Sequence, residues 1–200
     1  MTVWVKVCGL TSLDAVAAAV AAGVDAIGFV FAESKRKVTA QRAAELARDV
    51  PKHIVRVAVM LHPSQQQLDD VWTHFRPDVL QTDIEDLPAL RVPDALRVMP
   101  VVRAGRELPT ILPARLLFEG PVSGTGATTD WAAAAALTSR TQLILAGGLN
   151  PANVAAAIVT AQPFGVDVSS GVEAQPGVKD SEKIHEFVRN ARAASSGVKR

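Results

Sequence analysis

Short apolar runs alternate along this chain with segments whose apolar residues recur at helical spacing. The first run, at 3–8, alternates apolar and polar positions and stops at Gly9. Over 12–22 the apolar residues then lie three and four positions apart, as in a helix with one buried face. The same order recurs to the end of the chain. We expect strands at 3–8, 25–31, 54–60, 79–81, 96–102, 115–119, 142–146 and 164–168, and helices at 12–22, 40–49, 64–75, 87–91, 131–137, 151–161 and from 180 onward.

These strands indicate a parallel sheet, because Val, Ile and Leu occupy both of their faces, as in sheets covered by helices. Eight strand–helix units without a long insertion favour closure over the structural alternative, an open doubly wound sheet. Prolines make the fourth and fifth helical segments, at 87–91 and 103–114, short or irregular. We therefore predict an α/β fold, a compact single-domain (β/α)8 TIM barrel over 1–194, and a flexible C-terminal tail over 195–200.

Capping signals place several helix ends. Thr11 and Asp14 have the spacing of a capping box before the first helix, and Gly23 suits its C-terminal end. Asn150 followed by Pro151 suits the N-cap and first position of the helix that ends at residue 161.

Composition and charge exclude several classes of function. The formal net charge of +1 gives no basic surface for nucleic acid. No apolar run approaches the roughly 20 residues that span a bilayer, and the first strand begins by residue 3, so we expect neither a membrane nor a signal peptide. The single cysteine excludes an internal disulfide and a multi-cysteine metal site, and the four histidines show no metal-ligand spacing. We expect a cytoplasmic protein without a metal.

Cys8, that single cysteine, is a candidate catalytic residue because of where it stands. It ends the first strand just before a glycine turn, and side chains at the carboxyl ends of barrel strands face the ligand. Position alone leaves an equal alternative, a small buried hydrophobic residue. Lys6 shares a strand face with Cys8 and could supply the positive charge that makes a thiol a usable base.

Two glycine-bearing loops at the last two strand ends predict a phosphate site. Residues 146–151 follow the seventh strand and lead into a helix, and residues 166–173 close the eighth. Backbone N–H groups of such loops hold phosphate without a lysine, and barrel enzymes commonly place a phosphate at this corner. The alternative is that these glycines only allow turns. The substrate is therefore expected to be a small phosphorylated molecule.

Other strand ends supply charged candidates. Glu119 terminates the apolar sixth strand and is a candidate general acid or base, or alternatively an exposed residue at the strand exit. Arg36, after the second strand, could bind a carboxylate through two hydrogen bonds, or belong to a solvated basic loop. The Ser-Gly-Thr-Gly segment at 123–126 lacks the spacing of a dinucleotide fingerprint and is interpreted as a flexible active-site loop. We assign no role to His62, which lies near the same end of the barrel.

Taken together, these segments resemble the phosphoribosylanthranilate isomerases of tryptophan biosynthesis over essentially the whole chain. The resemblance is carried by Val5-Lys6-Val7-Cys8-Gly9-Leu10-Thr11, Gly28-Phe29-Val30-Phe31 with Ser34-Lys35-Arg36, Gly124-Thr125-Gly126 with Asp130-Trp131, Ala146-Gly147-Gly148-Leu149-Asn150-Pro151, and Val166-Asp167-Val168-Ser169-Ser170-Gly171-Val172-Glu173 with Pro176-Gly177.

The resemblance implies an Amadori rearrangement without a cofactor, which converts N-(5-phosphoribosyl)anthranilate to 1-(2-carboxyphenylamino)-1-deoxyribulose 5-phosphate. It implies that Cys8 is the general base at C2 of the ribose and that Glu119, in place of the family's aspartate, is the general acid at the ring oxygen. The implied substrate-binding residues are Arg36 for the anthranilate carboxylate, Asp167 for the ribose hydroxyls or protonated amine, and the amides of Gly147, Gly148, Ser169 and Ser170 for phosphate.

Three positions depart from the family pattern. Glu119 adds a methylene to the usual aspartate, which changes its reach by roughly 1 Å. Gln81-Thr82-Asp83 stands where the family has Gln-Leu-His, so a role for that histidine is not transferred. Thr129 replaces a phenylalanine.

The alternatives are a related sugar-phosphate isomerase or epimerase barrel and a non-catalytic barrel that binds a phosphorylated metabolite. A barrel acting on both tryptophan and histidine intermediates would be expected to carry an aspartate in place of Cys8. A monomer and a homodimer both fit the sequence.

Overall fold

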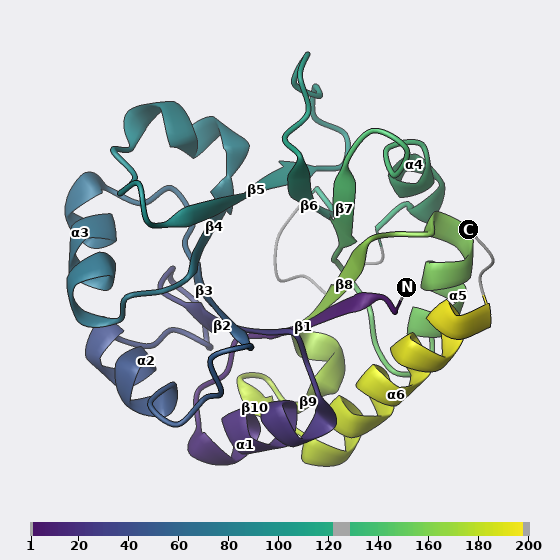
Figure 1. Ribbon diagram of the computed structural model, residues 1–200, viewed down its shortest axis with the longest axis horizontal. Coiled ribbons are helices and arrows are strands. Elements are labelled where there is room, and N and C mark those ends of the chain that lie inside the picture. The colour runs from purple at the N-terminus through teal and green to yellow at the C-terminus, as the bar shows by residue number, and fades with distance from the viewer. Residues whose placement is uncertain (1, 122–128, 198–200) are drawn as a thin grey trace.

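The computed structural model describes residues 2–121 and 129–197 and shows a closed barrel of eight parallel strands inside a ring of helices (Figure 1). This confirms the (β/α)8 prediction. The barrel strands are β1 (Trp4–Cys8), β2 (Ala26–Val30), β3 (Val55–Val59), β4 (Val79–Asp83), β5 (Arg97–Arg103), β6 (Arg115–Glu119), β7 (Gln142–Leu145) and β8 (Gly165–Val168). The helices are α1 (Leu13–Ala22), α2 (Ala40–Leu46), α3 (Gln65–His74), α4 (Trp131–Ala135), α5 (Val154–Ala161) and α6 (Ser181–Gly197).

The barrel closes where the first strand meets the last. Val7 of β1 pairs with Val168 of β8, and on its other side with Ile27 of β2. After β8, the short 3-10 helix η2 (Ser170–Val172) and the two-stranded ribbon of β9 (Glu173–Gln175) and β10 (Val178–Lys179) precede α6. The helix after β4 is a 3-10 helix, η1 (Ile84–Ala89), and none of the described residues between β5 and β6 is helical, which confirms that these two units are irregular.

The structure corrects three predicted helix ends. Ser12, not Thr11, is the N-cap of α1, and its side chain accepts a hydrogen bond from Ala15 N. Helix α5 begins at Val154, because Asn150 and the two residues after Pro151 form a turn in which the Asn150 side chain accepts from Ala152 N. Helix α6 continues to Gly197, so 195–197, assigned to the tail, are helical; 198–200 lie outside the described residues.

Apolar residues form two layers, one between the strands and the helices and a smaller one inside the barrel. The inner layer includes Val57, Met99, Leu117 and Ile144. It gives way toward the carboxyl ends of the strands to buried charged side chains, Lys6, Asp83, Arg103 and Asp167. Each of these four buried charges needs an oppositely charged or hydrogen-bonding partner. These partners lie in the site described next. Among the described helices, none is long and apolar enough to cross a membrane.

Candidate active site

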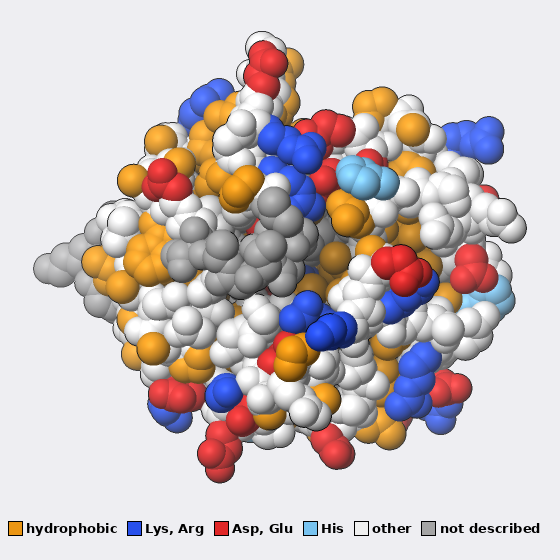
Figure 2. All heavy atoms as spheres, turned by 180° about the vertical axis from the view of Figure 1, so that it is seen from behind, with side chains coloured by type: hydrophobic (Ala, Val, Ile, Leu, Met, Phe, Trp, Pro, Cys, Tyr) orange, Lys and Arg blue, Asp and Glu red, His pale blue; other side chains and the backbone are white. Residues whose placement is uncertain are grey.

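A cavity of about 210 Å³ opens at the carboxyl ends of the strands. The space-filling view shows the barrel from behind, with acidic and basic side chains gathered around a hollowed centre (Figure 2). The structure brings together all the residues predicted to act on the substrate: Cys8, Arg36, Glu119, Gly147, Gly148, Asp167, Ser169 and Ser170 line this cavity. Their individual roles remain predictions.

Cys8 lies at the wall formed by β1 and β8, above a buried ion pair. Lys6 Nζ donates to Asp167 Oδ1 at 2.8 Å, and the Lys6 side chain is fully buried. Gly28 on β2 makes room for this group, because a Cβ there would lie 3.0 Å from Cys8 Sγ and 3.1 Å from Lys6 Cε. The expectation that Lys6 shares a face with Cys8 is confirmed.

The expected effect on the Cys8 thiol is corrected. Burial raises the pKa of Cys8, and the positive charges of Lys6 and Lys179 offset this only in part, while Asp167 adds to the rise. The sequence showed the cation but not the carboxylate that neutralises it. Burial therefore favours the thiol form of Cys8 over the thiolate.

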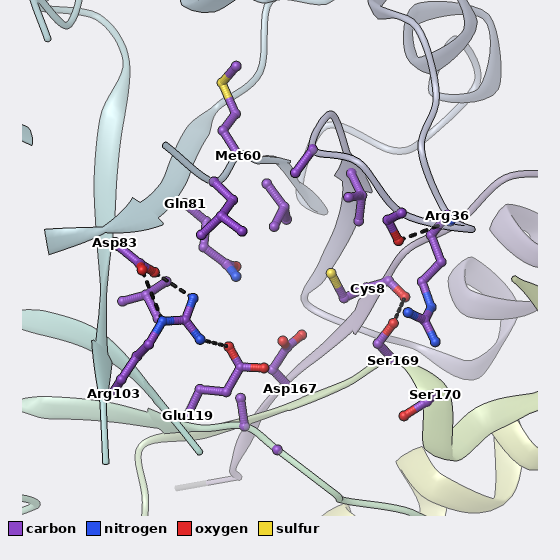
Figure 3. A pocket seen from close by; sticks show the side chains of 18 of the residues that line it. Cys8, Arg36, Met60, Gln81, Asp83, Arg103, Glu119, Asp167, Ser169 and Ser170 are labelled. Atoms are coloured by element: carbon purple, nitrogen blue, oxygen red, sulfur yellow. Dashed lines mark hydrogen bonds and ion pairs between the residues drawn. The ribbon is translucent and has the colours of Figure 1, made fainter. Parts of the chain in front are cut away.

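Glu119 lies across the cavity from Cys8, at the end of β6 (Figure 3). Its side chain is 17 % exposed, and its Oε2 accepts a hydrogen bond from Arg103 Nη1 at 3.3 Å. Arg103 also donates from Nε and Nη2 to Asp83, at 2.9 and 2.6 Å. Sequence reasoning missed Arg103 as a site residue and gave Asp83 no role. The available signal was a charged residue directly after each of two apolar strands.

Arg36 reaches the cavity but is already held by a carboxylate. Its Nε and Nη2 donate to Glu173 at 2.6 and 2.9 Å, which leaves Nη1 outside that pair. Burial acts to raise the pKa of Glu173, but hydrogen bonds from Arg36 and Lys179 outweigh it and lower that pKa to about 2. Arg36 is thus a fixed, charged group at the rim and not a solvated loop residue.

The two predicted phosphate loops meet at the corner between β7 and β8. Gly147 and Gly148 have φ values of 92° and 65°, a conformation that favours glycine. A Cβ on Gly171 would lie 1.9 Å from Leu149 O, so the second loop packs directly against the first. Ser169 faces the same corner, where Lys179 Nζ donates to its carbonyl at 2.8 Å. Gly147, Gly148, Ser169 and Ser170 of this corner all line the cavity.

Gln81 was noted only as part of a departure from the family pattern. It is 6 % exposed and points into the cavity (Figure 3). Its Oε1 is buried and has no hydrogen-bond partner among the residues that the structure describes. A buried acceptor without a donor is costly, so Gln81 is suited to accept a hydrogen bond from a bound molecule.

The predicted loop at 123–126 lies outside the described residues. Thr129 is buried, and its hydroxyl donates to Ala146 O at 2.6 Å, one residue beyond the end of β7. No cluster of three or more potential metal ligands occurs in the described parts of the chain.

Comparison with known proteins gives one consistent family. The family model for N-(5'phosphoribosyl)anthranilate (PRA) isomerase matches residues 5–190. An N-(5'-phosphoribosyl)anthranilate isomerase of Streptococcus pneumoniae is 40% identical over 202 residues, covering 98% of each chain.

Solved structures agree. The phosphoribosyl anthranilate isomerase of Thermotoga maritima superimposes with a TM-score of 0.83 at 32% identity, over 96% of this chain and 100% of that one. A phosphoribosyl anthranilate isomerase in complex with reduced 1-(o-carboxyphenylamino)-1-deoxyribulose 5-phosphate has a TM-score of 0.79 at 31% identity, with the same coverage. TrpF of Jonesia denitrificans is 38% identical, with a TM-score of 0.79 over 97% of this chain and 98% of that one.

Proposed function

The chain belongs to the N-(5'-phosphoribosyl)anthranilate isomerase family, and from that premise we propose how its cavity carries out the reaction. It is an isomerase of tryptophan biosynthesis that catalyses the Amadori rearrangement of N-(5-phosphoribosyl)anthranilate to 1-(2-carboxyphenylamino)-1-deoxyribulose 5-phosphate. The reaction needs one group that gives a proton to the ring oxygen and another that takes one from C2. The observation that supports our assignment is that Cys8 and Glu119 line one cavity from opposite walls, with the glycine corner at its edge.

Binding fixes the substrate at its two charged ends. The backbone amides of Gly147, Gly148, Ser169 and Ser170 hold the phosphate. Arg36, whose guanidinium is oriented by Glu173, binds the anthranilate carboxylate through the nitrogen that this ion pair does not use. A solved relative is named as a complex with a ligand that carries both a phosphate and a carboxyphenyl group, which supports this assignment. The ribose then lies between the two ends, at the centre of the cavity.

Ring opening comes first. Glu119 protonates the ring oxygen, the bond from C1 to that oxygen breaks, and the nitrogen lone pair forms a protonated Schiff base at C1. Asp167 Oδ1 is held by Lys6, and Asp167 orients the ribose hydroxyls or the protonated amine. The positive charge created in this step lies one bond from C2.

The positive charge of the Schiff base promotes removal of the proton from C2. This neighbouring cation favours the thiolate of Cys8, whose pKa burial otherwise raises, so the Cys8 thiol releases its proton to solvent. The same cation also acidifies the C2 proton. The thiolate takes this proton, and the electron pair of the C–H bond moves toward the iminium nitrogen to give an enolamine. The enolamine gains a proton at C1 and loses its hydroxyl proton to become the ketone, so atoms and charge balance.

Turnover by the purified protein tests these roles. Loss of substrate fluorescence is followed for the wild type and for the Cys8→Ala and Glu119→Gln variants. We expect each variant to lose at least about 100-fold in kcat, the scale of a general acid or base. If the wild type binds inorganic phosphate but does not turn over the substrate, the proposed isomerase activity is contradicted. If Cys8→Ala keeps its activity, the proposed role of Cys8 as general base is contradicted.

The location and assembly of the protein are part of the same proposal. We place it in the cytoplasm. There its one cysteine, Cys8, which is free and buried, stays reduced. A relative from Thermotoga maritima is described as dimeric, and this chain is proposed to act as a monomer or homodimer. Light scattering of the purified protein distinguishes the two.

A further inference from the structure

Three charged side chains stand side by side at the ends of β4, β5 and β6, opposite Cys8. Asp83 and Arg103 are almost completely buried, with 1 % and 7 % exposure. Arg103 is the register partner of Glu119 across the β5–β6 ladder. The barrel strands thus fix the backbone positions of all three residues.

Arg103 is bound unequally by its two carboxylates. Asp83 accepts from Nε and Nη2 at 2.9 and 2.6 Å, a bidentate pair, whereas Glu119 accepts from Nη1 alone at 3.3 Å. Bidentate pairs between arginine and carboxylate are the strong ones, and a single long contact is weak. Most of the attraction of Arg103 is therefore directed at Asp83.

We propose, resting on the general-acid role of Glu119, that Arg103 is a positioning residue that points the Glu119 carboxyl into the cavity, and that Asp83 neutralises Arg103 so that Glu119 can still carry a proton. A general acid must be protonated when the substrate binds. An arginine alone beside a carboxyl would work against this, because an opposite charge within about 4–6 Å lowers a carboxyl pKa by about 1–3 units. Asp83 supplies the compensating negative charge and orients the guanidinium.

Other charged or titratable side chains also line the described part of the cavity. Asp167, on the far side of Glu119 in Figure 3, is paired with Lys6. The remaining charged or titratable side chains among the described lining residues are Cys8, Glu33 and Arg36.

A titration of Glu119 itself tests the proposal. The Cδ carbon of Glu119 is followed by NMR in protein labelled with [13C]glutamate, and its signal is assigned by loss in Glu119→Gln. In Asp83→Asn the midpoint is expected to fall by about one pH unit, because Arg103 then acts on Glu119 uncompensated. In the double variant Asp83→Asn, Arg103→Gln it is expected to rise above the wild-type value by about one pH unit, because the cation is gone.

The double variant removes both Asp83 and the charge of Arg103, so it should fold even if Asp83→Asn alone does not. Asp78→Asn is the matched control: it breaks the bidentate Arg56–Asp78 pair, at 3.0 and 3.1 Å, near the opposite ends of the strands, and should leave the Glu119 midpoint unchanged. The proposal would be overturned if the Glu119 midpoint is the same in the wild type, Asp83→Asn and the double variant. It would also be overturned if the midpoint shifts in the same direction in both of these variants.

Kinetics separate this proposal from the one on which it rests. With Asp83→Asn, kcat/KM near neutral pH should fall about tenfold, because a midpoint one unit lower means a tenfold smaller protonated fraction. The Glu119-dependent limb of the pH profile should move with the NMR midpoint in both variants. If Glu119→Gln keeps full activity, the general-acid role fails whatever the titration shows. If Glu119→Gln is inactive and the midpoints do not move, only the role of Arg103 and Asp83 fails.

Discussion

The two walls of the cavity each combine one reactive group with one buried ion pair, and the pairs act differently. At the β1–β8 wall, Lys6 and Asp167 lie beneath a thiol that is itself 6 % exposed. At the β4–β6 wall, Asp83 and Arg103 lie behind Glu119, which one hydrogen bond ties to the pair. In the mechanism that we propose, the first wall keeps Cys8 protonated until the substrate becomes cationic, and the second wall holds Glu119 in place while it carries its proton. The proposed mechanism thus places protonation by Glu119 before proton removal by Cys8.

The largest effect is expected from breaking the pair at the first wall. Lys6→Met leaves Asp167 as an uncompensated buried carboxylate, which should cost about 3–5 kcal/mol in the free energy of unfolding measured with urea. The double variant Lys6→Met, Asp167→Leu removes both charges and should recover most of that stability while remaining inactive. An active double variant would show that this pair serves the fold alone.

A second effect concerns the rim, where Glu173 joins Arg36 and Lys179. The pKa of Glu173 is lowered from 4.5 to about 2 in the folded protein, so the unfolded state binds its proton first as pH falls. Stability from this group is complete above about pH 4.5 and is lost on acidification toward pH 2; from the shift it amounts to at most about 3 kcal/mol. Glu173→Gln should thus be less stable than the wild type at pH 7 and should lose less on acidification to pH 3. The free energy of unfolding of both proteins is measured with urea at pH 7 and pH 3. An equal decrease for the wild type and Glu173→Gln would contradict this prediction.

A smaller effect is expected at Gln81, between the two walls. Gln81→Leu removes a buried acceptor that lacks a partner in this structure, so it should raise KM about five- to tenfold, the value of one hydrogen bond to substrate, with little change in kcat. The free energy of unfolding should increase by about 1 kcal/mol, because an unsatisfied polar atom is lost. An unchanged KM would show that no substrate donor reaches Oε1.

The smallest effect is expected outside the walls, at His62. Its ring pairs with Asp86 at 2.7 Å, which raises the pKa of His62, but its side chain is 63 % exposed. Such a pair contributes less than about 1 kcal/mol, present at pH below about 6.5 and lost as pH rises through the raised pKa. His62→Asn should keep kcat/KM within about twofold in the turnover assay, and a larger loss would place His62 in the site.

The sequence predicts one wall better than the other, for physical reasons. Alternating strands and helices favour the barrel, and Cys8 stands at the carboxyl end of a barrel strand, where side chains commonly face the ligand. The strand expected at 79–81 stopped two residues before Asp83, and the one at 96–102 stopped one residue before Arg103. Both charges were thus treated as loop residues, although they end strands and face inward.

The sequence also did not show which charged side chains on different strands pair with one another. Asp83 and Arg103 are 20 residues apart, and only the register between β4 and β5 brings them together. For the same reason the sequence showed Lys6 beside Cys8 but not that Asp167, on β8, takes up its charge. The N-cap of α1 was misplaced by one residue because Thr11 and Ser12 both carry a hydroxyl suited to capping.

Isotopic substitution at C2 tests whether Cys8 takes the proton from that carbon after Glu119 has opened the ring. Single-turnover rates are measured for substrate with hydrogen or deuterium at C2, using the wild type and Cys8→Ala. The wild type should turn over the deuterated substrate more slowly, and Cys8→Ala should lose at least about 100-fold with either substrate. Turnover by Cys8→Ala at the wild-type rate would contradict this role of Cys8.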